Sequence, residues 1–230
     1  MTDLIAAIHA NDAESVDVMR YALLKALPGA GWAEDELESG ALPSGDWWIT
    51  DPVEGNINHI HGLTDWCVTA TLVRDNVPVL TVIYLPLSNH LYTATLGGGA
   101  FLDGARLRTS SKTHLNAALV GTGQAKPGED SETHRRIGES VTAMLGAALV
   151  VRVSVPATLQ LIHVADGRLD VFWQFSQVRS GLVAGALLVA EAGGKVTDIR
   201  GRPWSLTSET FLATAPALSA AASTRLAKIR

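Results

Sequence analysis

Residues 48–62 of this 230-residue chain bring two carboxylates and two imidazoles close together along the sequence. The candidates for chemistry in this stretch are Asp51, Glu54, Asn56, His59 and His61. If the stretch is extended, His59 and His61 point to one side, because alternate side chains of a strand share a face. Such a pair can bind Zn²⁺ or exchange protons, whereas a histidine packed in the core needs neither role. Asp51 can equally cap the turn before Pro52, so residue types alone leave the chemistry open.

The elements that position these residues are predicted from apolar spacing. Residues 13–27 are expected to form a helix, because apolar residues recur there at helical intervals. An acidic stretch rich in Gly, Ser and Pro, residues 34–46, is predicted to be a loop. An antiparallel sheet is then expected, with strands at 47–50, 66–74, 77–85 and 90–95, and turns at 75–76, 97–99 and 103–104.

Helices and strands alternate after residue 114, which predicts a second lobe of the α/β type over residues 115–230. The first lobe, residues 1–114, is predicted to be α+β. The strands expected in the second lobe are 118–122, 149–153, 169–173 and 195–199, and the helices are 135–145, 158–165 and 181–192.

Composition restricts the classes of partner. The apolar fraction of 47% and the charged fraction of 18% are ordinary for a globular protein. A net charge of −5 gives no electrostatic footprint for nucleic acid. No apolar run approaches 18 residues, so no membrane partner is expected. A single cysteine, Cys67, excludes an internal disulfide, and no signal-peptide pattern is seen at the N-terminus. We therefore expect a cytoplasmic protein.

Three blocks of sequence resemble the inositol monophosphatase family. Residues 48–62 are similar to its signature, roughly Trp-Ile-(Ile/Val)-Asp-Pro-(Ile/Leu/Val)-Asp-Gly-Thr-x-Asn-(Phe/Tyr). Residues 99–110 resemble the next block, and residues 164–170 with 191–198 resemble the third. The resemblance covers the chain from about residue 10 to its end. It implies a layered αβαβα sandwich, here without the family's first helix, and Mg²⁺-dependent hydrolysis of a phosphate monoester.

The resemblance also implies which residues form the site. The metal ligands fall on Glu34, Asp51, the backbone carbonyl of Val53, and Glu54. Catalysis falls on Glu34, Asp51, Glu54 and Asn56, and His59, which stands where the family has an aromatic residue, is a further candidate for acid–base chemistry. Substrate binding falls on Gly55, Asn56 and Gln174, and Arg179, two residues before Gly181, is a further candidate because its guanidinium can pair with an anion. A small, phosphorylated substrate and a homodimer are the partners expected. Glu34 also belongs to an acidic run, for which a solvated surface is the ordinary interpretation.

Three departures from the family pattern affect the chemistry. Glu54 stands where the family has Asp, Asn56 where it has Thr, and Gly181 where its Trp-Asp-x-Ala-Ala-Gly segment has the last metal-binding Asp. Losing that carboxylate predicts a weakened, degenerate metal site, because less negative charge balances a second cation. Three hypotheses stay open: a divergent Mg²⁺-dependent phosphatase, a family member repurposed for a metal-independent reaction, and a non-catalytic ligand-binding protein.

Overall fold

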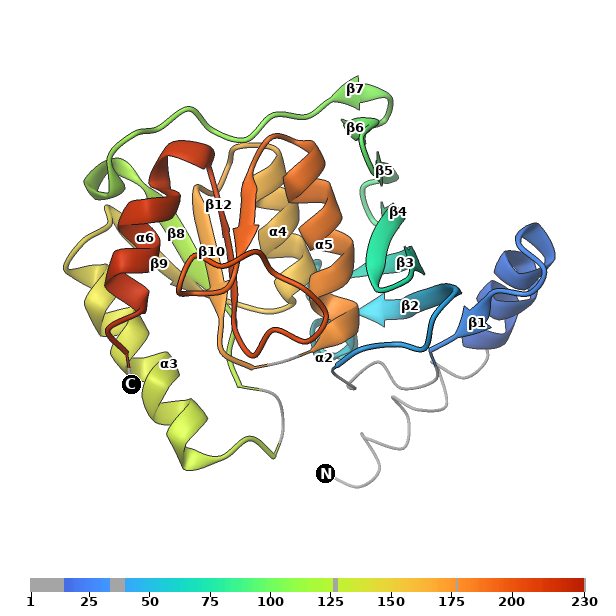
Figure 1. Ribbon diagram of the computed structural model, residues 1–230, viewed down its shortest axis with the longest axis horizontal. Helices are drawn as coiled ribbons and strands as arrows, with labels where there is room; N and C mark the ends of the chain where they lie inside the picture. Colours follow the sequence, from blue (N-terminus) through green and yellow to red (C-terminus); the bar gives the residue numbers. More distant parts are fainter. Residues whose placement is uncertain (1–14, 34–39, 126–127, 177, 230) are drawn as a thin grey trace.

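Helical layers alternate with two β-sheets in the computed structural model, which describes residues 15–33, 40–125, 128–176 and 178–229 (Figure 1). An N-terminal helix, residues 15–26, covers one face of the first sheet. Helices α4 (Ala157–Ala165) and α5 (Arg179–Glu191) lie between the sheets. Helices α3 (Ser131–Leu145) and α6 (Ser219–Leu226) cover the far face of the second sheet. The layered αβαβα sandwich of the α/β class is therefore confirmed.

The first sheet has seven strands in the order in which the chain makes them. They are β1 (Gly31–Trp32), β2 (Asp46–Glu54), β3 (Cys67–Arg74), β4 (Val77–Leu85), β5 (His90–Thr95), β6 (Gly99–Leu102) and β7 (Ala105–Arg106). All neighbours are antiparallel except β1, which lies parallel to β2. Asp75 and Asn76 have φ of 47° and 65°, the left-handed conformation that tight hairpin turns require.

The predicted apolar face of the N-terminal helix is confirmed. Val16, Met19 and Leu23 pack against the buried indoles of Trp32 and Trp48. The helix therefore buries its apolar stripe on the sheet, as expected from 3.6-residue spacing. The sequence suggests Asp12 as the N-cap of this helix, a position that lies outside the described residues.

The second sheet has five strands in the order β11-β12-β10-β8-β9. Their bounds are Leu119–Thr122 for β8, Val150–Val153 for β9, Val171–Gln174 for β10, Lys195–Thr197 for β11 and Phe211–Thr214 for β12. Strand β8 lies parallel to both neighbours, whereas β12 is antiparallel to β10 and β11. Strand β12 and helix α6 had not been predicted. Helix α3 begins four residues before the predicted start, because the Asp130 carboxylate caps it by accepting from Thr133 N at 2.7 Å.

Helices α4 and α5 approach each other closely between the sheets. A Cβ at Gly185 would lie 2.3 Å from Leu161 Cδ1, so only glycine permits this contact. Most of α5 is buried, which explains why its sequence is apolar on every side. Helix α5 packs against β2 to β6 as well as against β11 and β12, so residues from the second half of the chain complete the core of the first sheet.

A buried carboxylate holds the chain segment that connects the first sheet to the second. Asp170 is fully buried and accepts hydrogen bonds from Ser110 Oγ at 2.5 Å, Lys112 Nζ at 2.7 Å and Leu119 N at 2.7 Å. The division into lobes at residues 114 and 115 stays a prediction.

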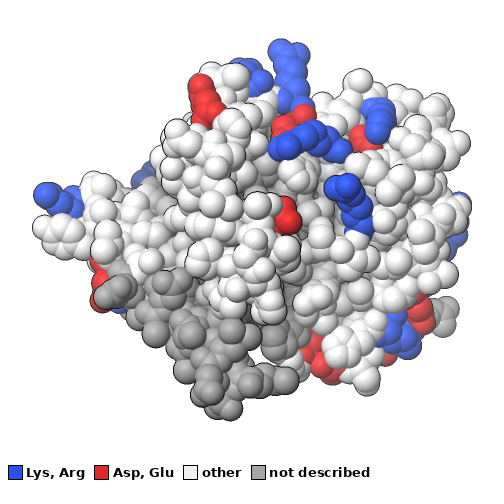
Figure 2. Space-filling model, turned by 180° about the vertical axis from the view of Figure 1, so that it is seen from behind, with Lys and Arg blue, Asp and Glu red and all other residues white. Residues whose placement is uncertain are grey.

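Charged side chains of both signs are separated by wide uncharged areas on the face seen in Figure 2. Among the described residues, no helix has the length and apolar character needed to cross a membrane.

Candidate functional site

A bulge at the end of β2 brings two carboxylates to one face of the sheet. Asp51 lies opposite Thr69 and Glu54 opposite Cys67, so three residue steps on β2 match two on β3. Thr69 and Cys67 share a face of β3, and directly opposed residues point the same way. Asp51 and Glu54 therefore share that face, although a regular strand would place them on opposite sides. Asp51 Oδ1 accepts from Val53 N at 2.9 Å, which stabilises the bulge.

Both carboxylates are buried, with 6% of Asp51 and 8% of Glu54 exposed. They also act on a common neighbour. Burial raises the pKa of the Cys67 thiol well above its usual value, and the negative charges of Glu54 and then Asp51 raise it further. Both acids therefore lie near the same sulfur at the end of β2, where a cation would be attracted by both.

The Glu54 side chain extends from the end of β2 toward the start of α5. Its Oε1 lies 3.1 Å from where a Cβ at Gly181 would stand. The hydroxyl of Thr158, on α4, is 3.3 Å from the same oxygen and 3.0 Å from the Gly181 carbonyl. Thr158 had not been predicted as a site residue. Its signal in the sequence is its place directly after Val155-Pro156-Ala157, which stands where the family that this chain resembles has Gly-Ser-Ala.

Gly55 turns the chain from β2 into α2 (Asn56–Ile60). Its φ is 95°, and a Cβ there would lie 2.8 Å from the Asp65 carbonyl oxygen and 2.9 Å from Pro156 Cγ. Glycine is therefore required both for the backbone angle and for the close approach.

Asn58 fastens α2 to the second half of the chain. It is buried, and its Nδ2 donates to the carbonyls of Asp65 at 2.7 Å and Val155 at 2.8 Å. This positioning role had not been predicted, although Asn58 matches the Asn of the family signature. The amide holds the loop at Val155 and Pro156 against the carboxylate-bearing segment.

The segment of His59 and His61 is not extended, because His59 lies in α2 and His61 caps that helix. Residues two apart on a helix do not share a face. The His59 ring packs edge-on against Trp66 at 4.7 Å between centroids, and its Nδ1 has no hydrogen-bond partner among the described residues. This environment favours a packing role for His59.

The remaining candidates lie on separate elements. Asn56 is half-buried at the first position of α2. Gln174 ends β10 and donates from Nε2 to the Ser176 carbonyl at 2.7 Å. Arg179 begins α5, is buried, and donates from Nη1 to the Gly40 carbonyl at 3.4 Å. Glu34 lies outside the described residues.

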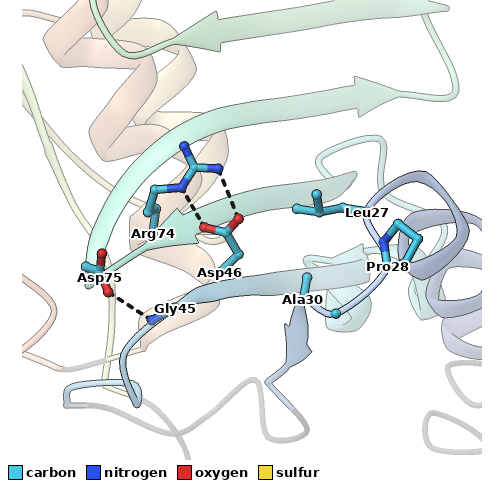
Figure 3. Close-up of a pocket in the computed structure, with 8 residues that line it drawn as sticks. Leu27, Pro28, Ala30, Gly45, Asp46, Arg74 and Asp75 are labelled. Carbon is cyan, nitrogen blue, oxygen red and sulfur yellow. Dashed lines mark hydrogen bonds and ion pairs between the residues drawn. The ribbon is translucent and has the colours of Figure 1, made fainter.

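A cavity of about 340 Å³ lies at the opposite end of β2 (Figure 3). Asp46 begins that strand and makes a two-point ion pair with Arg74, at 2.6 Å and 3.0 Å. Eight strand steps separate Asp46 from Glu54, which corresponds to roughly 26 Å. The cavity in Figure 3 is therefore remote from the buried carboxylates.

The donors at the carboxylate end suit one Mg²⁺ ion. Asp51, Glu54 and the Val53 carbonyl offer hard oxygen ligands, which Mg²⁺ prefers. No group of three or more His, Cys, Asp or Glu side chains that could hold a metal occurs within the described part of the chain. Two carboxylates and a carbonyl, completed by water, fit a single hard cation better than a pair.

Comparison with known proteins shows the family to which the chain belongs. A sequence model of the inositol monophosphatase family matches residues 6–230. The inositol-1-monophosphatase of Rhizobium meliloti is 35% identical over 191 residues, covering 83% of this chain and 71% of that protein. The Nus factor SuhB of Xylella fastidiosa is 38% identical over 154 residues, covering 67% and 55%.

Solved structures give the same result. The inositol monophosphatase of Anabaena superposes with a TM-score of 0.85 at 27% identity, covering 99% of this chain and 90% of that one. The match of the family model, the percentage identities and the common fold all agree. The chain belongs to the inositol monophosphatase family.

Proposed function

We propose that this protein is a divergent, Mg²⁺-dependent hydrolase of a small phosphate monoester that works with one metal ion. The observation that carries the proposal is the bulge of β2, which turns the buried carboxylates of Asp51 and Glu54 to one face. Membership of a family that includes proteins named inositol-1-monophosphatase supports the reaction class.

In this proposal Asp51, Glu54 and the Val53 carbonyl hold the metal, with Glu34 as a further ligand. Mg²⁺ bound there would polarise a phosphate oxygen and lower the pKa of a water molecule. The Asn56 amide hydrogen-bonds and orients that water, but it cannot relay a proton as a hydroxyl can. Turnover by this protein is therefore expected to be slower than turnover by other members of the family.

The substrate side is proposed to use Gly55, Gln174 and Arg179. Gly55 allows the backbone to turn sharply beside the metal ligands. The guanidinium of Arg179 matches the geometry of a phosphate. Gln174 offers a neutral amide where the family often has an acid, which favours an ester with fewer or differently placed hydroxyl groups than inositol phosphate. The homodimer and the cytoplasmic location stay predictions.

Calorimetry with Mg²⁺ and Mn²⁺ tests the proposal directly. We expect one ion per chain, at micromolar to low millimolar strength, and no binding by Asp51→Asn at the same concentrations. A screen of phosphate monoesters with the loaded protein then identifies the substrate class. Absence of metal binding by the unaltered protein would contradict the proposal and direct the search to metal-independent catalysis or to ligand binding.

A further inference from the structure

Position 181 has lost a carboxylate relative to the family signature, and another carboxylate has moved toward it. The nearest atoms to an ideal Cβ at Gly181 all belong to Glu54: Oε1 at 3.1 Å, and Cδ and Oε2 at 3.7 Å. The space in which a side chain at 181 would begin is therefore filled by the carboxylate from the end of β2. Glu54 reaches this place because its side chain has one methylene more than the Asp of the signature.

The Thr158 hydroxyl lies between these two elements. Thr158 is fully buried, and its Oγ1 is 3.0 Å from the Gly181 carbonyl oxygen and 3.3 Å from Glu54 Oε1. Because a threonine has one hydroxyl proton, it donates to these two acceptors in alternation or as a shared bond. It thereby joins β2 and α5 through α4.

We propose that Thr158 is a positioning residue that holds the Glu54 carboxylate at the place of the missing ligand. Glu54 then offers an oxygen to the metal from the α5 side, so that one long acid replaces the two shorter ones of the signature. This inference rests on the proposed single-metal function. It explains the departures from the family pattern at positions 54 and 181 together, with Thr158 as the residue that links them.

The physical reason is preorganisation. A glutamate side chain loses conformational freedom when it is fixed, and this loss opposes metal binding. A buried hydroxyl that restrains the carboxylate in the metal-free protein reduces the part of this cost that metal binding must supply. Removing groups that orient metal ligands typically lowers metal affinity by about 10- to 100-fold.

The test is Mn²⁺ affinity, measured by calorimetry, in the full chain and in matched variants. Thr158→Val keeps the shape of the side chain and removes the hydroxyl. We expect it to bind Mn²⁺ about 10-fold or more weakly. Thr158→Ser keeps the hydroxyl and is expected to stay within about threefold of the unaltered protein. The difference between the two variants separates positioning from packing, because Ser loses more packing volume than Val.

Gly181→Ala provides a second route if Thr158→Val does not fold. Its methyl group would stand 3.1 Å from Glu54 Oε1 and force the carboxylate to shift, while the Thr158 hydroxyl stays in place. Alanine also favours helix more than glycine does. We expect weaker Mn²⁺ binding by at least about fivefold, with the thermal midpoint maintained.

Different outcomes overturn different statements. Equal Mn²⁺ affinity in the unaltered protein, Thr158→Val and Gly181→Ala would overturn the inference and leave the single-metal proposal standing. Thr158→Ser binding as weakly as Thr158→Val would also overturn it. No Mn²⁺ binding by the unaltered protein would overturn the proposed function and this inference together.

Discussion

Glu54 and Gly181 are complementary in size, because the long acid at the end of β2 occupies the space that the absent side chain of Gly181 on α5 leaves open. The match gives a prediction at the scale of single residues. The double variant Glu54→Asp with Gly181→Asp shortens one arm and restores a carboxylate beside it. It should bind a second divalent ion and raise kcat/KM for a phosphate monoester by at least about tenfold. This rise corresponds to an activation free energy lower by about 1.4 kcal/mol.

The single variant Gly181→Asp is the control for that prediction. Its side chain would meet the unshortened Glu54, and two buried acids at this separation repel each other. We expect lower stability in urea without any gain in turnover. A double variant that gains neither a second ion nor activity would count against the metal-based reading of this site.

Asp51, Glu54 and Asn56 could be proposed as candidates from the sequence, because they lie in a linear motif. The sequence could not show that Asp51 and Glu54 share a face, since this depends on one extra residue in β2. Nor could it reveal Thr158, whose contact with Glu54 joins positions 104 residues apart. The sequence left open whether His59 and His61 share a side, because the short helix that separates them depends on the left-handed conformation of Gly55.

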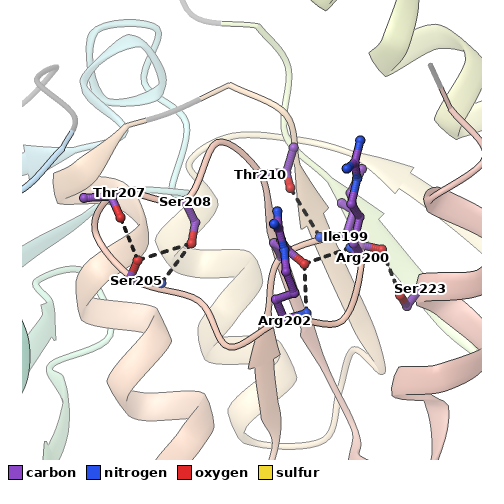
Figure 4. A network of polar contacts seen from close by, with 9 residues as sticks. Ile199, Arg200, Arg202, Ser205, Thr207, Ser208, Thr210 and Ser223 are labelled. Carbon is purple, nitrogen blue, oxygen red and sulfur yellow. Dashed lines mark hydrogen bonds and ion pairs between the residues drawn. The ribbon is translucent and has the colours of Figure 1, made fainter.

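At the scale of elements, the loop after β11 is built around one buried acid. Asp198 accepts from the backbone nitrogens of Arg200 and Arg202, each at 2.9 Å, and from Arg202 Nε at 2.6 Å. Figure 4 shows the surrounding contacts, including Ser223 Oγ, which donates to the Ile199 carbonyl at 2.8 Å and ties the loop to α6.

This loop predicts a pH dependence of stability. Burial pushes the pKa of Asp198 upward, but the hydrogen bonds from Arg202 and Arg200 outweigh burial and leave it below its usual value. The contribution of Asp198 is therefore complete above its unfolded pKa near 4, and is lost as pH falls through the lower folded value. Asp198→Asn should reduce the free energy of unfolding by about 1–3 kcal/mol at pH 7.

The deficit of Asp198→Asn should shrink as the pH falls below about 4, because the unaltered protein loses the same stabilisation there. Urea unfolding at several pH values measures this. Asp46→Asn is the matched control, since the Asp46–Arg74 pair is exposed and should contribute little. A deficit that stays constant from pH 7 to pH 3 would contradict the role given to Asp198.

Long elements with clear periodicity were predictable, and short buried ones were not. The antiparallel strands β3 to β5 were located to within a residue because turn residues separate them. Strand β12 has four residues, all buried, so it lacks the alternation that marks a strand. Helix α6 is short and rich in alanine and serine, and its packing on the second sheet gives little periodic signal.

At the scale of the whole molecule, α5 packs against the inner faces of both sheets. It packs on β2 to β6 although it belongs to the second half of the chain. We therefore predict that residues 1–114 expressed alone will expose the inner face of their sheet and fail to form a stable fold. Circular dichroism and amide spectra of that fragment measure this, with the full chain as control. Well-dispersed spectra from residues 1–114 alone would contradict the prediction.

The position of α5 also affects how the protein is made. Strands β1 to β7 are neighbours in the order in which they leave the ribosome, and short connections that close quickly join β3 to β7. Their apolar inner face nevertheless has no α5 to cover it until residues 179–191 have been synthesised, a delay of several seconds at about 5–20 residues per second. During this interval the nascent chain presents an unfinished sheet, which is the kind of surface that chaperones bind.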